Sequence, residues 1–188
     1  GCAGSEVMGF TIRNGRTREG GGIFGDGVEV TVQWNVVEDN WATRYGGGIV
    51  GIDGLIRNNH IRSNRAAWGT GGGLYRCQGT IERNSIYGNY AFMNNDHYSS
   101  VSADGGGLAQ CDGMIGNNYI VSNHASASSW YADPFIETSI SVQGGGLSKC
   151  DGTIINNIIA ANTLSGTPWA YNPSYLGTGL YDCSGTIR

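Results

Sequence analysis

Residues 105–123 read GGGLAQCDGMIGNNYIVSN, and this stretch decides the fold because the chain repeats it several times. The other copies, some of them looser or shortened, occupy residues 20–40, 46–64, 71–89, 144–162 and 177–188. The first of these copies carries two extra residues, within GDGVEV, which leaves its alignment open. Self-similarity at a period of tens of residues is typical of a solenoid, in which each repeat packs against its neighbours.

Aligning the copies produces columns of apolar side chains. A leucine or isoleucine column follows the glycines, and two isoleucine columns lie seven and twelve residues further on. These β-branched segments are short and separated by glycines, so they predict strands and not helices. Three short strands per repeat, bent at fixed turns, predict one coil of a parallel β-helix, with about 4.8 Å between coils.

Asparagine forms two further columns, each at a predicted bend. They contain Asn35, Asn59, Asn84, Asn118 and Asn157, and Asn40, Asn64, Asn89, Asn123 and Asn162. An asparagine amide donates and accepts at once, so a stack can bond to the turns above and below. Asparagine also tolerates the left-handed backbone that such bends need. We therefore predict asparagine ladders inside the bends, with a row of polar binding residues as the alternative.

Cysteine occupies one column as well. The column contains Cys77, Cys111, Cys150 and Cys183, and Cys2 aligns with it. In-register parallel Cα–Cβ bonds disfavour a disulfide between neighbouring coils, and the spacing does not match a zinc site. We predict buried thiols that act as small apolar filler.

Composition limits the class of protein. The length of 188 residues suits one domain, and the 33 glycines stand in register and not in a low-complexity run. A net charge of -4 argues against a nucleic-acid partner, whose phosphates would need a basic stripe. No apolar run approaches the roughly 20 residues of a membrane span.

The repeated GGGLxxCxGTIxNNxIxxN, with GFTIRNG ahead of it at residues 9–15, resembles the right-handed parallel β-helix repeat family of bacterial surface and secreted proteins. The resemblance implies an all-β, right-handed parallel β-helix of about six coils over residues 1–188, located extracellularly or at a bacterial cell surface. It implies no single activity, because the family includes adhesin-like, outer-membrane and polysaccharide-processing proteins. Since Cys2 aligns with Cys183, we expect a fragment or subunit of a longer solenoid.

Three insertions, at residues 90–104, 124–143 and 163–176, leave the coils at the same corner. We predict long loops stacked along one edge, where function usually resides. The aromatic candidates for binding a glycan or a partner are Tyr98, Trp130, Tyr131, Trp169, Tyr171 and Tyr175. In the alternative, the loops fold onto the solenoid and use their rings as a satellite core.

Outward positions after the central isoleucine change from charged residues in the early copies to apolar ones in the late copies. The apolar candidates are Val121, Ile155 and Ile158. An apolar patch on an outer face is typical of an interface or of a surface beneath a covering segment. We predict that the C-terminal coils pack through this face against another chain or against one of their own loops.

The chemistry-bearing residues do not form a recognisable constellation. Two glycine runs match GxGxxG, but a dinucleotide site needs that loop between a strand and a helix. Asp53, Asp112 and Asp151 precede glycine at one turn, which is ordinary turn chemistry, with a calcium row as the alternative. Asp182 and Lys149 could form a cross-strand ion pair. We therefore expect no catalytic residues, no metal and no cofactor.

The sequence leaves two functions open. The first is a structural, adhesive or filament-forming role without catalysis, with self-association end to end or through the C-terminal apolar face. Strand edges left unpaired at both ends of a solenoid would favour it. The second is a module that binds or cleaves a polysaccharide along the aromatic loop edge. A groove lined by rings with a carboxylate beside it would favour cleavage.

Overall fold

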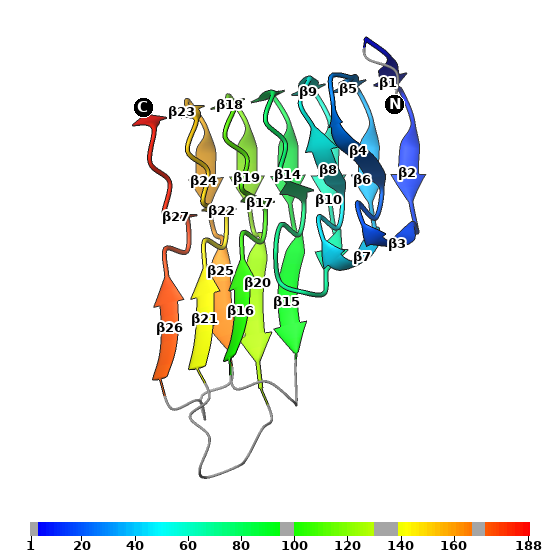
Figure 1. Ribbon diagram of the computed structural model, residues 1–188. Helices are drawn as coiled ribbons and strands as arrows, with labels where there is room; N and C mark the ends of the chain where they lie inside the picture. The colour runs from blue at the N-terminus through cyan, green and yellow to red at the C-terminus, as the bar shows by residue number, and fades with distance from the viewer. Residues whose placement is uncertain (1–3, 95–99, 130–138, 167–171) are drawn as a thin grey trace.

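The structure, a computed structural model, describes residues 4–94, 100–129, 139–166 and 172–188 (Figure 1). Within these ranges the chain is all-β, and it winds through stacked coils with the N- and C-termini at opposite ends of the stack (Figure 1). Three of the sheets along the stack contain six strands each, so the predicted parallel β-helix of about six coils is confirmed.

Four sheets run along the solenoid, and neighbouring strands in each are hydrogen-bonded in the following order. Sheet A contains β1 (Glu6–Met8), β5 (Thr31–Gln33), β9 (Leu55–Arg57), β13 (Thr80–Glu82), β18 (Met114–Gly116), β23 (Thr153–Ile155) and β28 (Thr186–Ile187). Sheet B contains β2 (Thr11–Arg13), β6 (Val36–Glu38), β10 (His60–Arg62), β14 (Ser85–Tyr87), β19 (Tyr119–Val121) and β24 (Ile158–Ala160). Sheet C contains β25 (Thr163–Gly166), β20 (His124–Ser128), β15 (Tyr90–Asn94), β11 (Arg65–Ala66), β7 (Trp41–Tyr45) and β3 (Arg16–Glu19). Sheet D contains β27 (Leu180–Tyr181), β22 (Leu147–Ser148), β17 (Leu108–Ala109), β12 (Leu74–Tyr75), β8 (Ile49–Ile52) and β4 (Ile23–Val28).

The strands in these four sheets pair in parallel, with like residues opposite one another. Ile81 pairs with Ile56 on one side and with Ile115 on the other. Each full coil runs through sheets D, A, B and C in turn, so the prediction of three strands per coil was one short. The extra residues of the first copy form a bulge in β4, where the register shifts between Phe24 and Val28.

The interior of the solenoid is a stack of identical side chains. The isoleucine and leucine columns are fully buried along most of the length, and the cysteine column lies in the same core. Cys77, Cys111 and Cys150 are buried free thiols and Cys183 is half-buried, which confirms their role as apolar filler. Cys2 lies outside the described residues. Coils approach so closely that a Cβ on Gly73 would come 2.7 Å from the carbonyl oxygen of Gly107.

The predicted asparagine ladders are confirmed. The Asn59 Nδ2 donates to Asn84 Oδ1 at 3.0 Å and to the Val32 carbonyl at 2.8 Å. The backbone N–H of Asn59 donates to the same Asn84 oxygen at 2.9 Å. The Asn84 side chain thus satisfies two donors of the preceding coil. The expected left-handed backbone belongs to the preceding residue, Asn58, with φ of 54°, and not to the ladder asparagine. The ladder amide is therefore selected for its hydrogen bonds.

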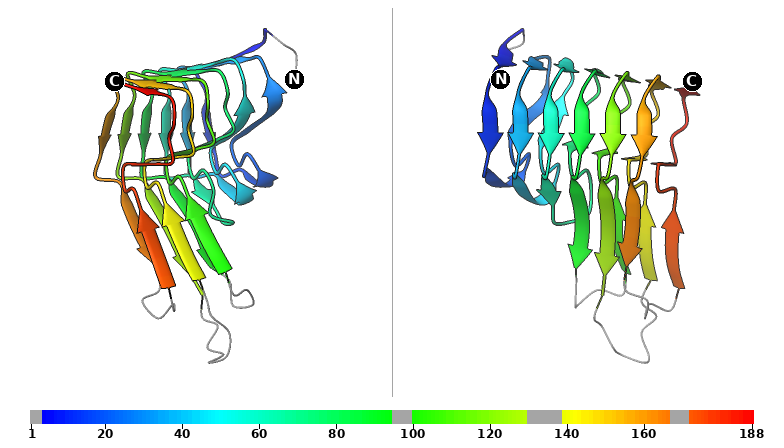
Figure 2. Two further views of the ribbon diagram at one scale, coloured as in Figure 1. Left: turned by 60° about the vertical axis from the view of Figure 1, so that its left-hand side comes forward. Right: turned by 180° about the vertical axis from the view of Figure 1, so that it is seen from behind.

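The three insertions are strands where the structure describes them. The chain leaves the solenoid along β15, β20 or β25 and returns along β16 (Ser100–Asp104), β21 (Ser139–Gln143) or β26 (Asn172–Leu176), which form a parallel sheet of their own. We call this second sheet and the facing part of sheet C the flap. Figure 2 shows its two layers projecting from one side of the coils.

A second core, separate from that of the solenoid, lies between the two layers of the flap. It consists of Ala91, Val101, Ala103, Ala125, Ala127, Ile140 and Val142, with Met93 and Leu164 packed against it. The prediction of loops was therefore wrong for the described residues, which form strands around an aliphatic satellite core. Most of the rings expected in such a core lie outside the described residues. The insertions form strands because small apolar residues at alternate positions allow the two sheets of the flap to pack face to face.

Candidate functional site

Most of the predicted aromatic site cannot be placed. Tyr98, Trp130, Tyr131, Trp169 and Tyr171 lie outside the described residues. Tyr175 lies in β26 and is 41% exposed. Its hydroxyl lies beside Gly166 of β25, so closely that a Cβ there would come within 2.6 Å of it.

The residues of the predicted apolar face differ in their exposure to solvent. Ile158 is 58% exposed, Ile155 is half-buried, and Val121 is only 8% exposed. Tyr119, which pairs with Ile158 in register, is 47% exposed. Association of this face with another chain or with a loop stays a prediction.

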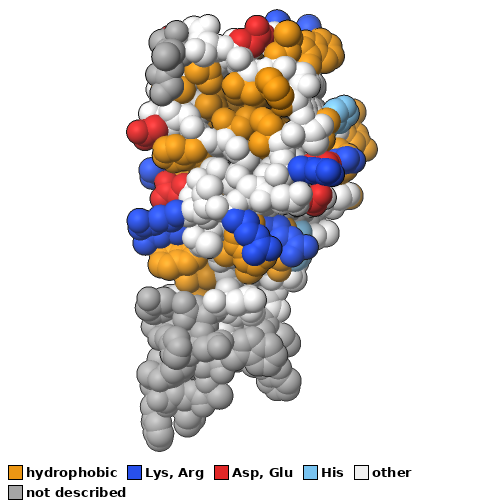
Figure 3. Space-filling view, turned by 90° about the vertical axis from the view of Figure 1, so that its right-hand side faces the viewer, with side chains coloured by type: hydrophobic (Ala, Val, Ile, Leu, Met, Phe, Trp, Pro, Cys, Tyr) orange, Lys and Arg blue, Asp and Glu red, His pale blue; other side chains and the backbone are white. Residues whose placement is uncertain are grey.

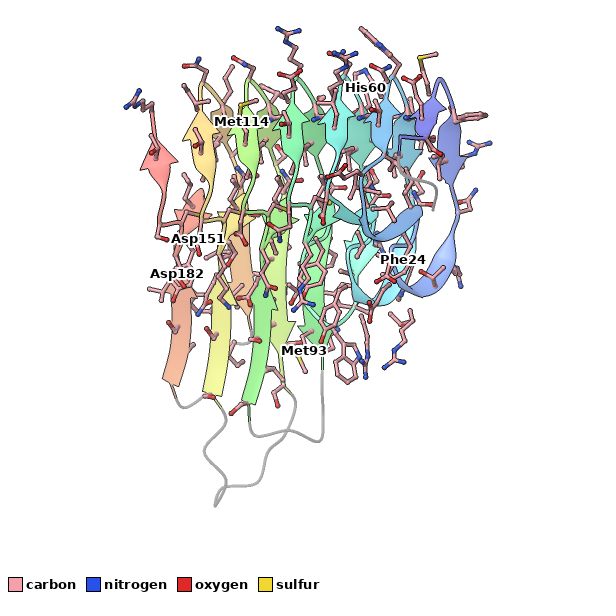
Figure 4. All side chains as sticks on the ribbon, turned by 45° about the horizontal axis from the view of Figure 1, so that its top comes forward. Phe24, His60, Met93, Met114, Asp151 and Asp182 are labelled. Carbon is pink, nitrogen blue, oxygen red and sulfur yellow. The ribbon has the colours of Figure 1, made fainter. Side chains whose placement is uncertain are left out.

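Ile158 and Tyr119 line a groove that the sequence did not predict. Two adjoining cavities of about 250 and 460 Å³ follow the corner between sheets A and B, and both are lined by Arg83 and Ser85. The first cavity is also lined by Trp34, Asn35, Val36, Asn58, Asn59 and His60. The second is also lined by Asn84, Asn117, Asn118, Tyr119, Asn156 and Ile158. We call the two together the corner groove. Figure 4 shows His60 among the side chains at the edge of the coils far from Met93 in the flap.

The corner groove follows a row of residues with left-handed backbone. This A–B corner contains Gly9, Trp34, Asn58, Arg83, Asn117 and Asn156, which have φ between 54° and 79°. Glycine and asparagine adopt this conformation at little cost, whereas a bulky side chain there is strained. Trp34, with φ of 57°, and Arg83, with φ of 54°, are the strained members of the row.

The next corner provides a comparison. The B–C corner has the same left-handed step, and its residues are Asn14, Asp39, Ser63, Gly88, Ser122 and Ala161. These are all small or short polar residues, as the backbone favours. The turn geometry therefore does not call for a tryptophan or an arginine at the equivalent place in the A–B corner.

Long side chains also occur at the left-handed positions of the D–A corner, but there they have partners within the chain. The Arg76 guanidinium lies 5.1 Å from the Tyr75 ring centroid and donates to Gln110 Oε1 at 3.1 Å. The Lys149 ammonium pairs with Asp104 at 2.9 Å, so its predicted pairing with Asp182 was wrong. Contacts within the protein thus account for these two strained residues.

Trp34 and Arg83 differ from them in this respect. Among the described residues, neither side chain has a hydrogen-bond, ion-pair or ring partner, and Trp34 is 61% exposed. An exposed indole and an unpaired guanidinium in a strained backbone add nothing evident to stability. Strain that the fold does not need points to function.

The chemistry available in the corner groove is that of binding. It offers an indole and a phenol ring, side-chain amides, a guanidinium and the His60 imidazole. Neither cavity is lined by a carboxylate among the described residues. In the same part of the chain, no group of three or more His, Cys, Asp or Glu side chains could hold a metal ion.

A row of calcium-binding aspartates was the alternative at this turn. Instead, these aspartates form hydrogen bonds to neighbouring coils. Asp151 Oδ1 accepts from the Ser184 backbone N–H at 2.9 Å and from its hydroxyl at 2.8 Å, and these bonds lower the pKa of Asp151. Asp112 Oδ1 accepts from the Asp151 backbone N–H at 3.0 Å. The row is therefore explained by turn structure.

Comparison with protein-family models, with curated proteins and with solved structures gives no match. The fold defines the chain as a parallel β-solenoid with buried asparagine ladders, and function is inferred from its own residues. No helix in the described ranges has the length and apolar character of a membrane span.

Proposed function

We propose that this protein is a non-catalytic, adhesive β-solenoid that binds a polysaccharide chain in the corner groove. The observation that carries the proposal is the pair of strained residues, Trp34 and Arg83, whose side chains have no partner among the described residues and line the groove. An extracellular or bacterial cell-surface location belongs to the same proposal.

A sugar chain suits the chemistry of the groove. Aromatic faces such as those of Trp34 and Tyr119 offer large rigid contact area to pyranose rings. The amides of Asn58, Asn117 and Asn156 can donate to and accept from hydroxyls. These groups recur at the coil spacing of about 4.8 Å, so a linear polymer can contact several of them in succession. A rigid scaffold loses little conformational entropy on binding.

Binding is favoured over cleavage by the groove lining. Most glycoside hydrolases place two carboxyl groups on either side of the scissile bond. The described lining of the corner groove contains none. A role in holding a polysaccharide therefore requires fewer assumptions than a role in hydrolysing it.

Affinity electrophoresis against soluble polysaccharides, followed by calorimetry on any that retard the protein, tests this proposal. Trp34→Asn should weaken binding about tenfold or more, because it removes the largest exposed ring and keeps a residue suited to the left-handed backbone. Trp68→Asn is the matched control, since it removes a tryptophan that is 44% exposed outside the groove. Equal losses in both variants, or no retardation by any polysaccharide, would overturn the proposal.

Exposed Ile158 favours a second candidate function, lateral self-association in a structural or filament-forming role. It lies beside Tyr119 on the same outer face of sheet B, and apolar patches of this kind often mark interfaces. Sedimentation over a range of concentrations distinguishes the two functions. Ile158→Lys should abolish oligomers if the face is an interface, and a monomer at every concentration excludes it.

A further inference from the structure

A second surface with unassigned binding chemistry lies on the outer face of sheet C. Its first outward column reads, coil by coil, Arg16, Trp41, Arg65, Tyr90 and His124. Register places Arg16 on one side of Trp41 and Arg65 on the other. The indole is therefore flanked by two guanidinium groups on neighbouring strands.

The rings of this surface form a continuous, braced platform. The Arg16 guanidinium lies 5.8 Å from the Trp41 ring centroid. Phe92 meets Trp41 edge to face, with centroids 6.0 Å apart and an angle of 87° between the planes. Tyr90 stacks on Phe92 at 4.9 Å and on His124 at 5.1 Å. The Trp41 ring is thus held in place before any ligand arrives.

The platform carries a cluster of arginines without ion-pair partners in the described residues. Arg16, Arg18 and Arg65 are exposed, and in the described residues none of them forms an ion pair. By contrast, Arg62 on sheet B pairs with Glu38 at 2.6 Å. Figure 3 shows basic side chains in a band across the lower half of the described surface, at the height of β3 and β7 in Figure 1. In a chain of net charge -4, such a cluster is complementary to an anion.

The surface is also hollowed at this place. One depression of about 370 Å³ is lined by Arg16, Thr17, Trp41 and Thr43. Another, of about 250 Å³, is lined by Arg16, Asp39, Asn40, Trp41, Ser63 and Arg65. Both share Arg16 and Trp41. Asp39 is the one carboxylate among these lining residues, so the basic groups outnumber it.

We propose that this platform binds an anionic polysaccharide, at a site distinct from the corner groove and independent of it. A sugar ring stacks on the Trp41 indole, and its sulfate or carboxylate groups accept hydrogen bonds from the guanidinium groups of Arg16 and Arg65. Guanidinium presents paired donors that match such oxyanions, which favours arginine over lysine at this place. The alternation of arginine and ring across the coils fits a polymer in which charged groups and rings alternate.

The test compares dextran sulfate with uncharged dextran, which share a backbone and differ in charge. Binding of both probes to the Trp34→Asn protein is measured by calorimetry at low and at physiological salt. That background weakens binding in the corner groove, so the platform accounts for a larger share of the result. We expect the protein to bind dextran sulfate and not dextran, and to bind more weakly as salt rises.

The deciding variant is Arg16→Gln with Arg65→Gln. It should weaken binding of dextran sulfate about tenfold or more, which corresponds to loss of one or two charge-assisted hydrogen bonds. Arg13→Gln with Arg188→Gln removes the same charge elsewhere and should have a much smaller effect. Equal losses in the two double variants, or equal binding of both dextrans, would overturn the proposal. So would binding of anionic lipid vesicles in the absence of any binding of dextran sulfate.

Discussion

Trp34 and Arg83 occupy the same place in two coils of the solenoid, and both adopt left-handed backbone directly before a ladder asparagine. The coil between them has Asn58 at this place, with nearly the same φ. The backbone of the corner therefore keeps nearly the same conformation whichever of these side chains it carries. What differs is the surface that the side chain presents to the corner groove.

Replacing Trp34 with asparagine should stabilise the protein. Asparagine relieves part of the left-handed strain, which costs roughly 1–2 kcal/mol for other L-residues. We expect the free energy of unfolding in urea to rise by about 1 kcal/mol. Arg83→Asn should have a similar effect.

Asn58→Ala provides the reverse change, since it places a less suitable residue in the same backbone, and it should lower stability. A clear loss of stability in Trp34→Asn would mean that the indole contributes packing energy. The case for a functional tryptophan would then fail.

The sequence predicts some parts of this fold better than others, for identifiable reasons. Isoleucine and leucine columns predict sheets A, B and D, because a β-branched or large residue repeated in register needs a shared core. Sheet C was missed because its inward column contains small residues, Ala42, Ala66, Ala91 and Ala125, which give no strand signal. The flap had a usable signal, because Val101 and Ala103, like Ile140 and Val142, alternate with polar residues along the chain.

The corner groove and the platform on sheet C could not be predicted from columns of apolar residues. Both depend on which outward side chains of neighbouring coils enclose a hollow, and an alignment of the copies shows that residues share a column but not that they enclose one. In the sequence Trp34 is one aromatic residue among many, and only its φ of 57° sets it apart. Arg16 and Arg65 are neighbours of Trp41 only through the strand pairing of sheet C.

Asn84→Ala in the middle of the first ladder should be strongly destabilising. Asn84 Oδ1 accepts from the backbone and side chain of Asn59, and Asn84 Nδ2 donates to Asn118 Oδ1 and the Ile56 carbonyl. Alanine leaves several buried polar groups unsatisfied, at about 1–3 kcal/mol each. We expect a loss of about 3 kcal/mol or more in urea unfolding.

Asn157→Ala is the matched control for the ladder. Asn157 is half-buried near the end of the same ladder, so water can replace some of its hydrogen bonds. Its loss should be clearly smaller than that of Asn84→Ala. Equal losses at the two positions would show that burial does not set the strength of the ladder.

His124 should make stability depend on pH. Burial lowers the pKa of His124, although the Thr163 backbone acts in the opposite direction. The folded state therefore binds the proton less readily than the unfolded state. The resulting stability is present above the unfolded pKa of about 6.5 and is lost as pH falls through the folded pKa.

Urea unfolding at pH 7.5 and pH 5 measures this effect. His124→Gln should reduce the difference in unfolding free energy between the two pH values. If His124→Gln behaves like the unsubstituted protein, His124 does not carry the pH dependence.

The ion pair between Asp104 and Lys149 ties the flap to the solenoid. Asp104 ends β16 and is 7% exposed, and its Oδ1 has no hydrogen-bond partner among the described residues. Burial raises the pKa of Asp104, and Lys149 opposes that rise. Lys149→Met leaves the carboxylate unpaired, which should cost about 3 kcal/mol at pH 7.

The cost should shrink on acidification. A raised folded pKa means that Asp104 contributes stability below its unfolded pKa and loses it as pH rises through the folded value. Adding Asp104→Asn to Lys149→Met should therefore recover most of the loss at pH 7, because no buried charge remains. A double variant as unstable as Lys149→Met alone would mean that Lys149 acts through packing of its methylene chain and not through its charge. Hydrogen exchange of β16 and β21 would then report whether the flap loosens separately from the coils.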